Sequence, residues 1–94
     1  MICRDVRFSR HAPQRMFERA ISENDVLDVL KKGETIEEYA NDIPYPSRLL
    51  LSRNAGRPLR VVAAHDPDSG FCIVIMVYIP DPAQWDEAFT RRRV

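Results

Sequence analysis

The chain has 94 residues, of which 45% are hydrophobic, and it contains three Gly and seven Pro. A chain of this size builds one hydrophobic core, so we expect a single domain over residues 1–94 and exclude repeat and multidomain architectures. Fourteen Lys and Arg balance fourteen Asp and Glu, and a formal charge of zero argues at first sight against a nucleic-acid partner.

Two helices are expected near the start of the chain. Ser9 can cap a helix that runs to about Arg19, because a serine side chain accepts from the free amides of a first turn. Ser22 can cap a second helix, with Asp25 at its third position and Gly33 as a left-handed stop. These signals predict a short helical hairpin.

Four strands follow the hairpin in the sequence. The links after the second and third strands are short and carry turn residues, so those strands are expected to pair as antiparallel neighbours. The last strand is apolar on both faces, which suits a central strand covered on one face by helices. The expected strands are Glu34–Tyr39, Ser47–Arg53, Pro58–His65 and Phe71–Ile79.

A last helix is expected after Pro80. Asp81 is a favourable cap with Pro82 at the first helical position, and Trp85 and Phe89 lie one turn apart, where they can dock the helix on the sheet. The complete pattern is α-α-β-β-β-β-α. It predicts an α+β domain in which helices pack on a four-stranded antiparallel sheet.

The neutral total conceals blocks of charge. Residues 1–21 carry a net charge of +3 and residues 43–65 carry +4, whereas residues 22–42 carry −5 and residues 66–94 carry −2. Arg outnumbers Lys by twelve to two, which suits forked contacts to phosphate or carboxylate. The alternative is that the basic blocks are solvated surfaces paired with the acidic ones.

The cysteine pattern indicates reduced thiols. Cys3 and Cys72 lie far apart in the sequence and belong to no Cys-x-x-Cys pair or His cluster, so we expect neither a zinc site nor a disulfide framework. Cys72 lies in an apolar run and is expected to be an inert core thiol. The first residues lack the apolar core of a signal peptide, so a cytoplasmic location is expected.

The first helix carries the main candidate for chemistry. His11, Arg15 and Arg19 recur every four residues and therefore align along one strip of the helix. An imidazole can move a proton while two guanidinium groups stabilise charge on a phosphate, as RNA cleavage by the 2′-hydroxyl requires. The alternative is structural: Arg15 pairs with Glu18 or with the acidic second helix, and His11 supports the helix start.

Two further candidates lie near strand ends. His65 closes the third strand and Tyr78 lies near the end of the fourth, although strict alternation places Arg60 on the opposite face from His65. Alternatively, His65 caps a turn and Tyr78 buries its ring with the hydroxyl at the edge. Phosphate contacts are expected from arginines of the second basic block and the C-terminal segment. These are Arg48, Arg53, Arg57, Arg60 and Arg91.

A family resemblance rests on the segment FSRHAPQRMFERAIS at residues 8–22. It is similar to the H-A-x-x-R-M-x-E-R-x-I-S signature that opens the domain of unknown function 4258 family. The similarity continues through Pro44-Tyr45-Pro46, Gly56-Arg57-Pro58-Leu59 and Val77-Tyr78-Ile79-Pro80-Asp81-Pro82 with Trp85, and covers nearly the whole chain. Residue by residue, it points to His11, Arg15, Arg19 and Tyr78.

The resemblance implies a function and a partner. The family plan resembles small toxins of the RelE, BrnT and MqsR kind, which implies a metal-independent messenger-RNA endonuclease without a cofactor. It also implies a cognate antitoxin, such as a zinc-finger protein of the MqsA type, and a homodimer is compatible with the sequence. A non-enzymatic module that binds protein or RNA through the same surface is the second hypothesis, because neither histidine has an orienting carboxylate at local spacing.

Overall fold

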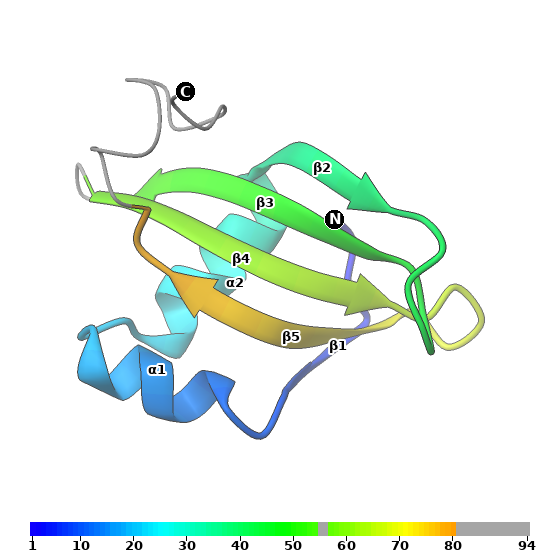
Figure 1. Ribbon diagram of the computed structural model, residues 1–94, viewed down its shortest axis with the longest axis horizontal. Coiled ribbons are helices and arrows are strands. Elements are labelled where there is room, and N and C mark those ends of the chain that lie inside the picture. The colour runs from blue at the N-terminus through cyan, green and yellow to red at the C-terminus, as the bar shows by residue number, and fades with distance from the viewer. Residues whose placement is uncertain (55–56, 81–94) are drawn as a thin grey trace.

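The computed structural model describes residues 1–54 and 57–80, which form one mixed sheet with two helices. The strand order is β1-β5-β4-β3-β2; β1 is parallel to β5, and all other neighbours are antiparallel (Figure 1). The expected four-stranded antiparallel sheet is therefore wrong, because a fifth strand joins it. The elements are β1 (Asp5–Phe8), α1 (Ala12–Glu18), α2 (Glu23–Lys32), β2 (Glu34–Tyr39), β3 (Ser47–Asn54), β4 (Arg57–His65) and β5 (Phe71–Tyr78).

β1 was not predicted from the sequence. Val6 and Phe8 alternate with Asp5 and Arg7, which is the period of a half-buried strand. Its partner is β5, with Asp5 paired to a residue 66 positions later. A parallel pair has no tight turn between its strands, so turn signals could not reveal it. The predicted last helix lies outside the described residues.

Helix α1 begins later than predicted. The Ser9 backbone N–H donates to the Val74 carbonyl at 2.8 Å, and its hydroxyl donates to the Ile75 carbonyl at 2.9 Å. Ser9 therefore extends the pairing of β1 with β5 and does not cap the helix. His11 takes the cap position without a side-chain hydrogen bond, and Pro13 lies in the first turn, where its missing N–H does no harm.

Helix α2 begins where the capping signals placed it. The Ser22 hydroxyl accepts from the Asp25 N–H at 3.1 Å, and the Asp25 carboxylate accepts from the Ser22 N–H at 2.9 Å. The predicted left-handed stop at Gly33 is wrong, since its φ is −64° and its ψ is 145°. Glycine is needed there for space, because a Cβ would collide with the Val29 carbonyl oxygen and crowd Leu50.

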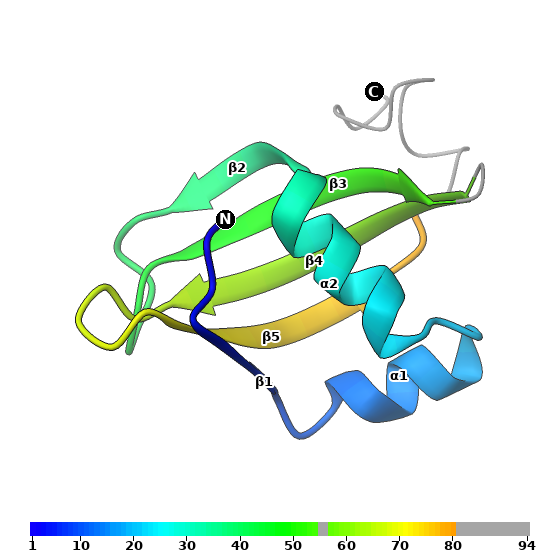
Figure 2. The same ribbon diagram turned by 180° about the vertical axis from the view of Figure 1, so that it is seen from behind.

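The strand register divides the sheet into two faces. Leu50, Val61 and Val77 lie side by side on β3, β4 and β5 and are buried in the core beneath the helices. Figure 2 shows α2 lying across this face, whereas α1 runs along the margin beside β5. We call the face opposite α2 the open face; it is the one seen in Figure 1. Among the described residues, no helix is long and apolar enough to cross a bilayer.

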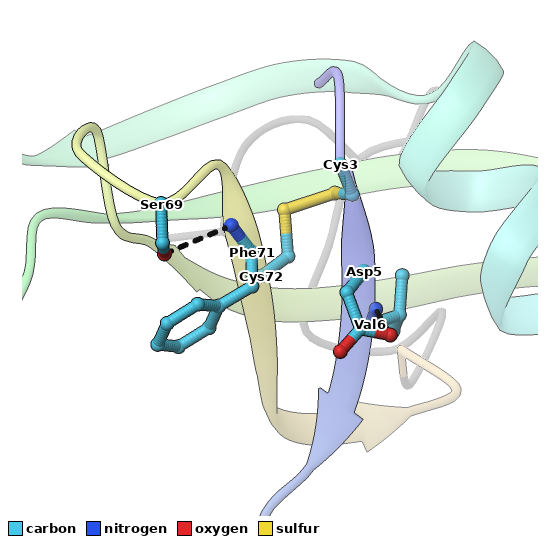
Figure 3. The surroundings of a disulfide bond; sticks show 6 residues. All are labelled: Cys3, Asp5, Val6, Ser69, Phe71 and Cys72. Carbon is cyan, nitrogen blue, oxygen red and sulfur yellow. Dashed lines mark hydrogen bonds between the residues drawn. A yellow bond between two sulfur atoms is a disulfide. The ribbon is translucent and has the colours of Figure 1, made fainter.

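A disulfide joins Cys3 to Cys72 and ties the segment before β1 to β5 (Figure 3). The two Cα atoms are 5.5 Å apart across a sequence separation of 69 residues. Cys72 is buried, as expected of a core residue, but the prediction of reduced thiols without a disulfide is wrong. The pair escaped sequence analysis because the parallel strand that brings Cys3 to β5 was not predicted.

Candidate functional site

The residues of the predicted strip, His11, Arg15 and Arg19, line a groove between α1 and β5. The groove consists of two hollows, of about 190 and about 280 Å³, and Arg15 and Met76 line both. Because the two hollows share these residues, we call them together the basic groove. The first hollow is also lined by Arg19, Val77 and Tyr78, and the second by His11, Ala12 and Ile75.

A bulge in β5 forms the apolar floor of the basic groove. Val62 pairs with Met76 and the next residue of β4 pairs with Val74, so Ile75 is left out of the pairing. A bulge of this kind re-aims side chains beside a site. Ile75 and Met76 are 37% and 51% exposed, respectively, so the three cationic or titratable side chains of α1 face an accessible apolar surface.

A buried arginine on the neighbouring strand orients Tyr78. Arg60 lies directly opposite Tyr78 in the β4–β5 pairing, and its Nη1 donates to the Tyr78 hydroxyl at 3.4 Å. The Arg60 side chain is fully buried. Because the Tyr78 oxygen accepts this bond, its own proton is available to a ligand in the groove.

Arg57 holds the C-terminal end of α1. Its Nη1 donates to the Arg19 carbonyl and its Nη2 to the Ala20 carbonyl, both at 3.2 Å. Its Nη2 also lies 3.7 Å from the Asp25 carboxylate of α2. Ala20 has a φ of +54°, a left-handed conformation that costs a non-glycine residue about 1 kcal/mol. Arg57, expected to bind RNA, thus fixes the chain reversal after Arg19.

The other predicted RNA-binding arginines are dispersed. Arg48 forms an ion pair with Glu38 at 3.7 Å. Arg53 is exposed near the end of β3, and Arg91 lies outside the described residues. Of the predicted arginines that the structure describes, Arg60 is the one at the basic groove, where it supports Tyr78 from within the sheet.

His65 lies at the other end of the sheet. It pairs with Cys72, whereas Arg60 pairs with Tyr78, and five steps along β4 correspond to about 17 Å. The same register places His65 and Arg60 on opposite faces, as alternation predicted. One phosphate cannot reach both His65 and His11. His65 instead lines a separate hollow of about 350 Å³ with Met1, Ile2 and Arg48.

A hollow of about 640 Å³ lies on the open face and shares Ile75 with the second hollow of the basic groove. Sequence reasoning missed it because its lining comes from four strands and the loop after β2. Beside it, the Tyr39 hydroxyl donates to Glu37 at 2.7 Å, and this bond raises the pKa of Tyr39 to about 12. The lining residues are Glu38, Tyr39, Ala40, Asn41, Asp42, Ser47, Val62 and Ile75.

Residues 1–54 and 57–80 contain no group of three or more His, Cys, Asp or Glu side chains that could hold a metal ion. In the same residues, neither histidine is hydrogen-bonded to a carboxylate. The arrangement that the described residues offer is therefore a histidine, two arginines and a tyrosine along one groove.

A family model described as Domain of unknown function (DUF4258) matches residues 8–79. The chain belongs to this family. The matched segment includes the whole of α1 and continues through Arg57, Arg60 and Tyr78, so it contains every residue described above at the basic groove. No curated protein and no solved structure matches the chain. The family description names no activity, and function is therefore argued from the site.

Proposed function

We propose that this domain binds RNA in the basic groove and cleaves it without a metal ion, as the toxin of a toxin–antitoxin pair. The observation that carries the proposal is the convergence of His11, Arg15, Arg19 and Tyr78 on one groove. Arg15 lies in α1, His11 and Arg19 are its N-terminal and C-terminal caps, and Tyr78 lies in β5, so the tertiary fold brings together residues that are distant in the sequence.

In the proposed reaction, the 2′-oxygen of RNA attacks the adjacent phosphorus and the bond from phosphorus to the 5′-oxygen breaks. The products are a 2′,3′-cyclic phosphate and a free 5′-hydroxyl. Neutral His11 takes the proton of the 2′-hydroxyl. Tyr78, held by Arg60, donates its proton to the leaving 5′-oxygen. His11 then releases its proton to water and Tyr78 takes one from water, so both side chains return to their starting states.

The two arginines of α1 stabilise the charge that develops during this step. Arg15 lines both hollows of the groove and Arg19 lines the one beside Tyr78, so both can reach the non-bridging phosphate oxygens. Guanidinium groups bind such oxygens through paired, charge-assisted hydrogen bonds. The exposed Met76 between them offers an apolar surface for a base or ribose.

The test is to incubate the purified chain with messenger RNA in EDTA and to map the ends of the products. We expect cleavage that leaves 2′,3′-cyclic phosphates. His11→Ala should reduce the rate by about 100-fold or more, the usual size of an acid–base contribution. His65→Ala is the matched control and should retain wild-type activity, because His65 lies far from the groove. No cleavage in EDTA, or full activity of His11→Ala, would reject the mechanism.

A non-enzymatic module that binds RNA or protein is the second candidate. It is favoured by the exposed position of His11, which no carboxylate of the described chain orients. A module should bind RNA without cutting it, and its expression should leave growth unchanged. A toxin acts on cytoplasmic messenger RNA, so its expression should arrest growth unless an antitoxin, such as a zinc-finger protein, is expressed with it.

A further inference from the structure

We infer that the hollow of about 640 Å³ beside the loop after β2 receives a base of the bound RNA, and that Asp42 selects guanine there. We call this feature the loop hollow. The inference rests on the proposed function and adds a specificity to it, namely cleavage on the 3′ side of guanosine. It starts from Ile75, which lines both the loop hollow and the part of the basic groove that His11 and Arg15 line.

The loop hollow lies on the His11 side of the basic groove. Ile75 and His11 line the same half of the groove, whereas Tyr78 lines the other half together with Arg19. In the proposed reaction, His11 takes the proton of the 2′-hydroxyl and Tyr78 protonates the leaving 5′-oxygen. The ribose that carries the attacking 2′-hydroxyl is therefore next to the loop hollow, and its base is the one that can enter.

The loop hollow is accessible and offers apolar surface to a base. Val62 on β4 and Ile75 on β5 line it from the sheet, and Ile75 is 37% exposed. Tyr39, which is 39% exposed, adds an aromatic ring. Unpaired RNA bases pack on aromatic and apolar side chains of this kind. The volume of the hollow is in the range of small-molecule sites.

The loop hollow extends across the sheet from the basic groove towards Asp42. Ser47 on β3 and Ile75 on β5 both line it, with β4 between these strands (Figure 1). Two strand spacings separate β3 from β5, which is about 10 Å. This length is comparable to that of a nucleoside, so a ribose held beside His11 can place its base close to Asp42.

Asp42 is held in one orientation by three hydrogen bonds. Its backbone N–H donates to the Tyr39 carbonyl at 3.1 Å. Its Oδ1 accepts from the Ile43 backbone N–H at 3.1 Å, and its Oδ2 accepts from the Ser47 hydroxyl at 2.7 Å. Ser47 is 1% exposed, so it anchors the carboxylate to β3 and need not be reached by a ligand. Each carboxylate oxygen retains a lone pair for a further donor.

A fixed carboxylate distinguishes the four bases by the donors that they present. Guanine carries two adjacent N–H donors, on N1 and on the 2-amino group, which match the two oxygens of a carboxylate. Adenine and cytosine have an acceptor nitrogen beside the amino group, and uracil has one N–H between two carbonyl oxygens. Guanine is therefore the base that can donate to both oxygens of Asp42.

The charges of the two neighbouring sites keep the base and the phosphate apart. Glu38 and Asp42 line the loop hollow, and their carboxylates repel phosphate but accept hydrogen bonds from an uncharged base. Arg15 lines both halves of the basic groove and attracts phosphate. The RNA therefore binds with its phosphate in the basic groove and its base in the loop hollow, which leaves the arginines of the groove free for the phosphate.

Cleavage of DNA oligonucleotides that carry a single ribonucleotide tests the inference, because only that nucleotide has the attacking 2′-hydroxyl. We expect cleavage after guanosine to be faster than after each other base by about tenfold or more, the usual discrimination of a paired contact to a base. Inosine lacks the 2-amino group and should lose most of this advantage. Asp42→Asn replaces one acceptor with a donor and should remove the preference for guanosine.

Glu34→Gln is the matched control for Asp42→Asn. It makes the same change from carboxylate to amide at an exposed residue at the other end of β2, which does not line the loop hollow. This variant should keep the preference for guanosine, and circular dichroism confirms that both variants are folded. Equal cleavage after all four bases, or a preference that Asp42→Asn retains, would overturn the inference and leave the proposed cleavage activity intact.

Binding of the four nucleoside 3′-monophosphates, measured by calorimetry, decides the inference if the chain does not cleave RNA. Guanosine 3′-monophosphate should bind about tenfold more tightly than the other three, and Asp42→Asn should abolish the difference. This result without cleavage would reject the proposed activity and support the assigned role of the loop hollow. Equal binding of all four nucleotides would overturn that role.

Discussion

The two ends of the β4–β5 pair are held together by different kinds of chemistry. At one end, Cys3 and Cys72 are joined covalently, and His65 lies beside them in the pairing. At the other end, Arg57 and Arg60 hold the basic groove together through hydrogen bonds to carbonyls and to Tyr78. A covalent link reduces the conformational entropy of the unfolded chain, whereas guanidinium contacts fix the local geometry of a site. The ends should therefore respond to different perturbations.

Loss of the disulfide should have the largest effect on stability. Cys3→Ser releases a loop closed across 69 residues, which should lower the free energy of unfolding by about 4 kcal/mol. The measurement is urea unfolding of the variant and of the oxidised and reduced wild type. The reduced wild type should resemble the variant. Equal stability of the oxidised and reduced wild type would show that the link contributes nothing.

Loss of Arg57 should have a smaller effect on stability and a specific effect on the groove. Arg57→Ala removes the bonds to the Arg19 and Ala20 carbonyls, so it should lower the free energy of unfolding by about 1–2 kcal/mol and weaken RNA binding. Arg57→Lys should stay weak, because a lysine cannot reproduce the forked contact.

Arg7→Ala is the matched control for Arg57. Arg7 lies on β1, forms an exposed ion pair with Asp5 at 3.6 Å and lies 4.6 Å from the centre of the Phe71 ring; exposed contacts of these kinds each contribute about 1 kcal/mol or less. Unfolding and RNA titration should therefore leave this variant close to the wild type. If the Arg57→Ala protein were as stable as the Arg7→Ala protein, the bonds of Arg57 to the Arg19 and Ala20 carbonyls would not stabilise the fold.

The smallest expected effect is the pH dependence of the bond between Tyr39 and Glu37 on β2. The bond to Glu37 raises the pKa of Tyr39 to about 12 from an ordinary value of 10.0. The stability from this bond is complete below pH 10 and is lost as the pH rises towards 12. Because Tyr39 is partly exposed, the loss should stay below about 1 kcal/mol. Urea unfolding at pH 9 and pH 11 should show a smaller drop for Tyr39→Phe than for the wild type.

Local signals in the sequence predicted local structure. The capping residues Ser22 and Asp25 placed α2, and the turn residues between strands placed β3, β4 and β5 as antiparallel neighbours. β1 and the Cys3–Cys72 bond depend on a parallel pairing across the whole chain, and no local pattern reports such a pairing. Gly33 was placed correctly at the helix end, but it is extended and not left-handed, and the lack of room for a Cβ is what requires glycine there.

The candidate site was likewise predicted only where it depends on local structure. Helical periodicity aligned His11, Arg15 and Arg19 because that alignment is a property of one helix. Periodicity could not show that Tyr78 lies beside them, or that His65 lies at the far end of the sheet. Arg57 was predicted to contact RNA because its charge is visible in the sequence, whereas its carbonyl partners are set by tertiary structure.

The pairing of the first strand with the last has a consequence for the protein during its synthesis. A nascent chain that has emerged only as far as β4 already contains His11, Arg15 and Arg19, but the wall formed by Met76 and Tyr78 has not yet been translated. β1 also has no partner until β5 leaves the ribosome. The groove therefore cannot form before β5 has been synthesised, and a chain that ends before β5 carries the basic helix without the surface that makes it a site.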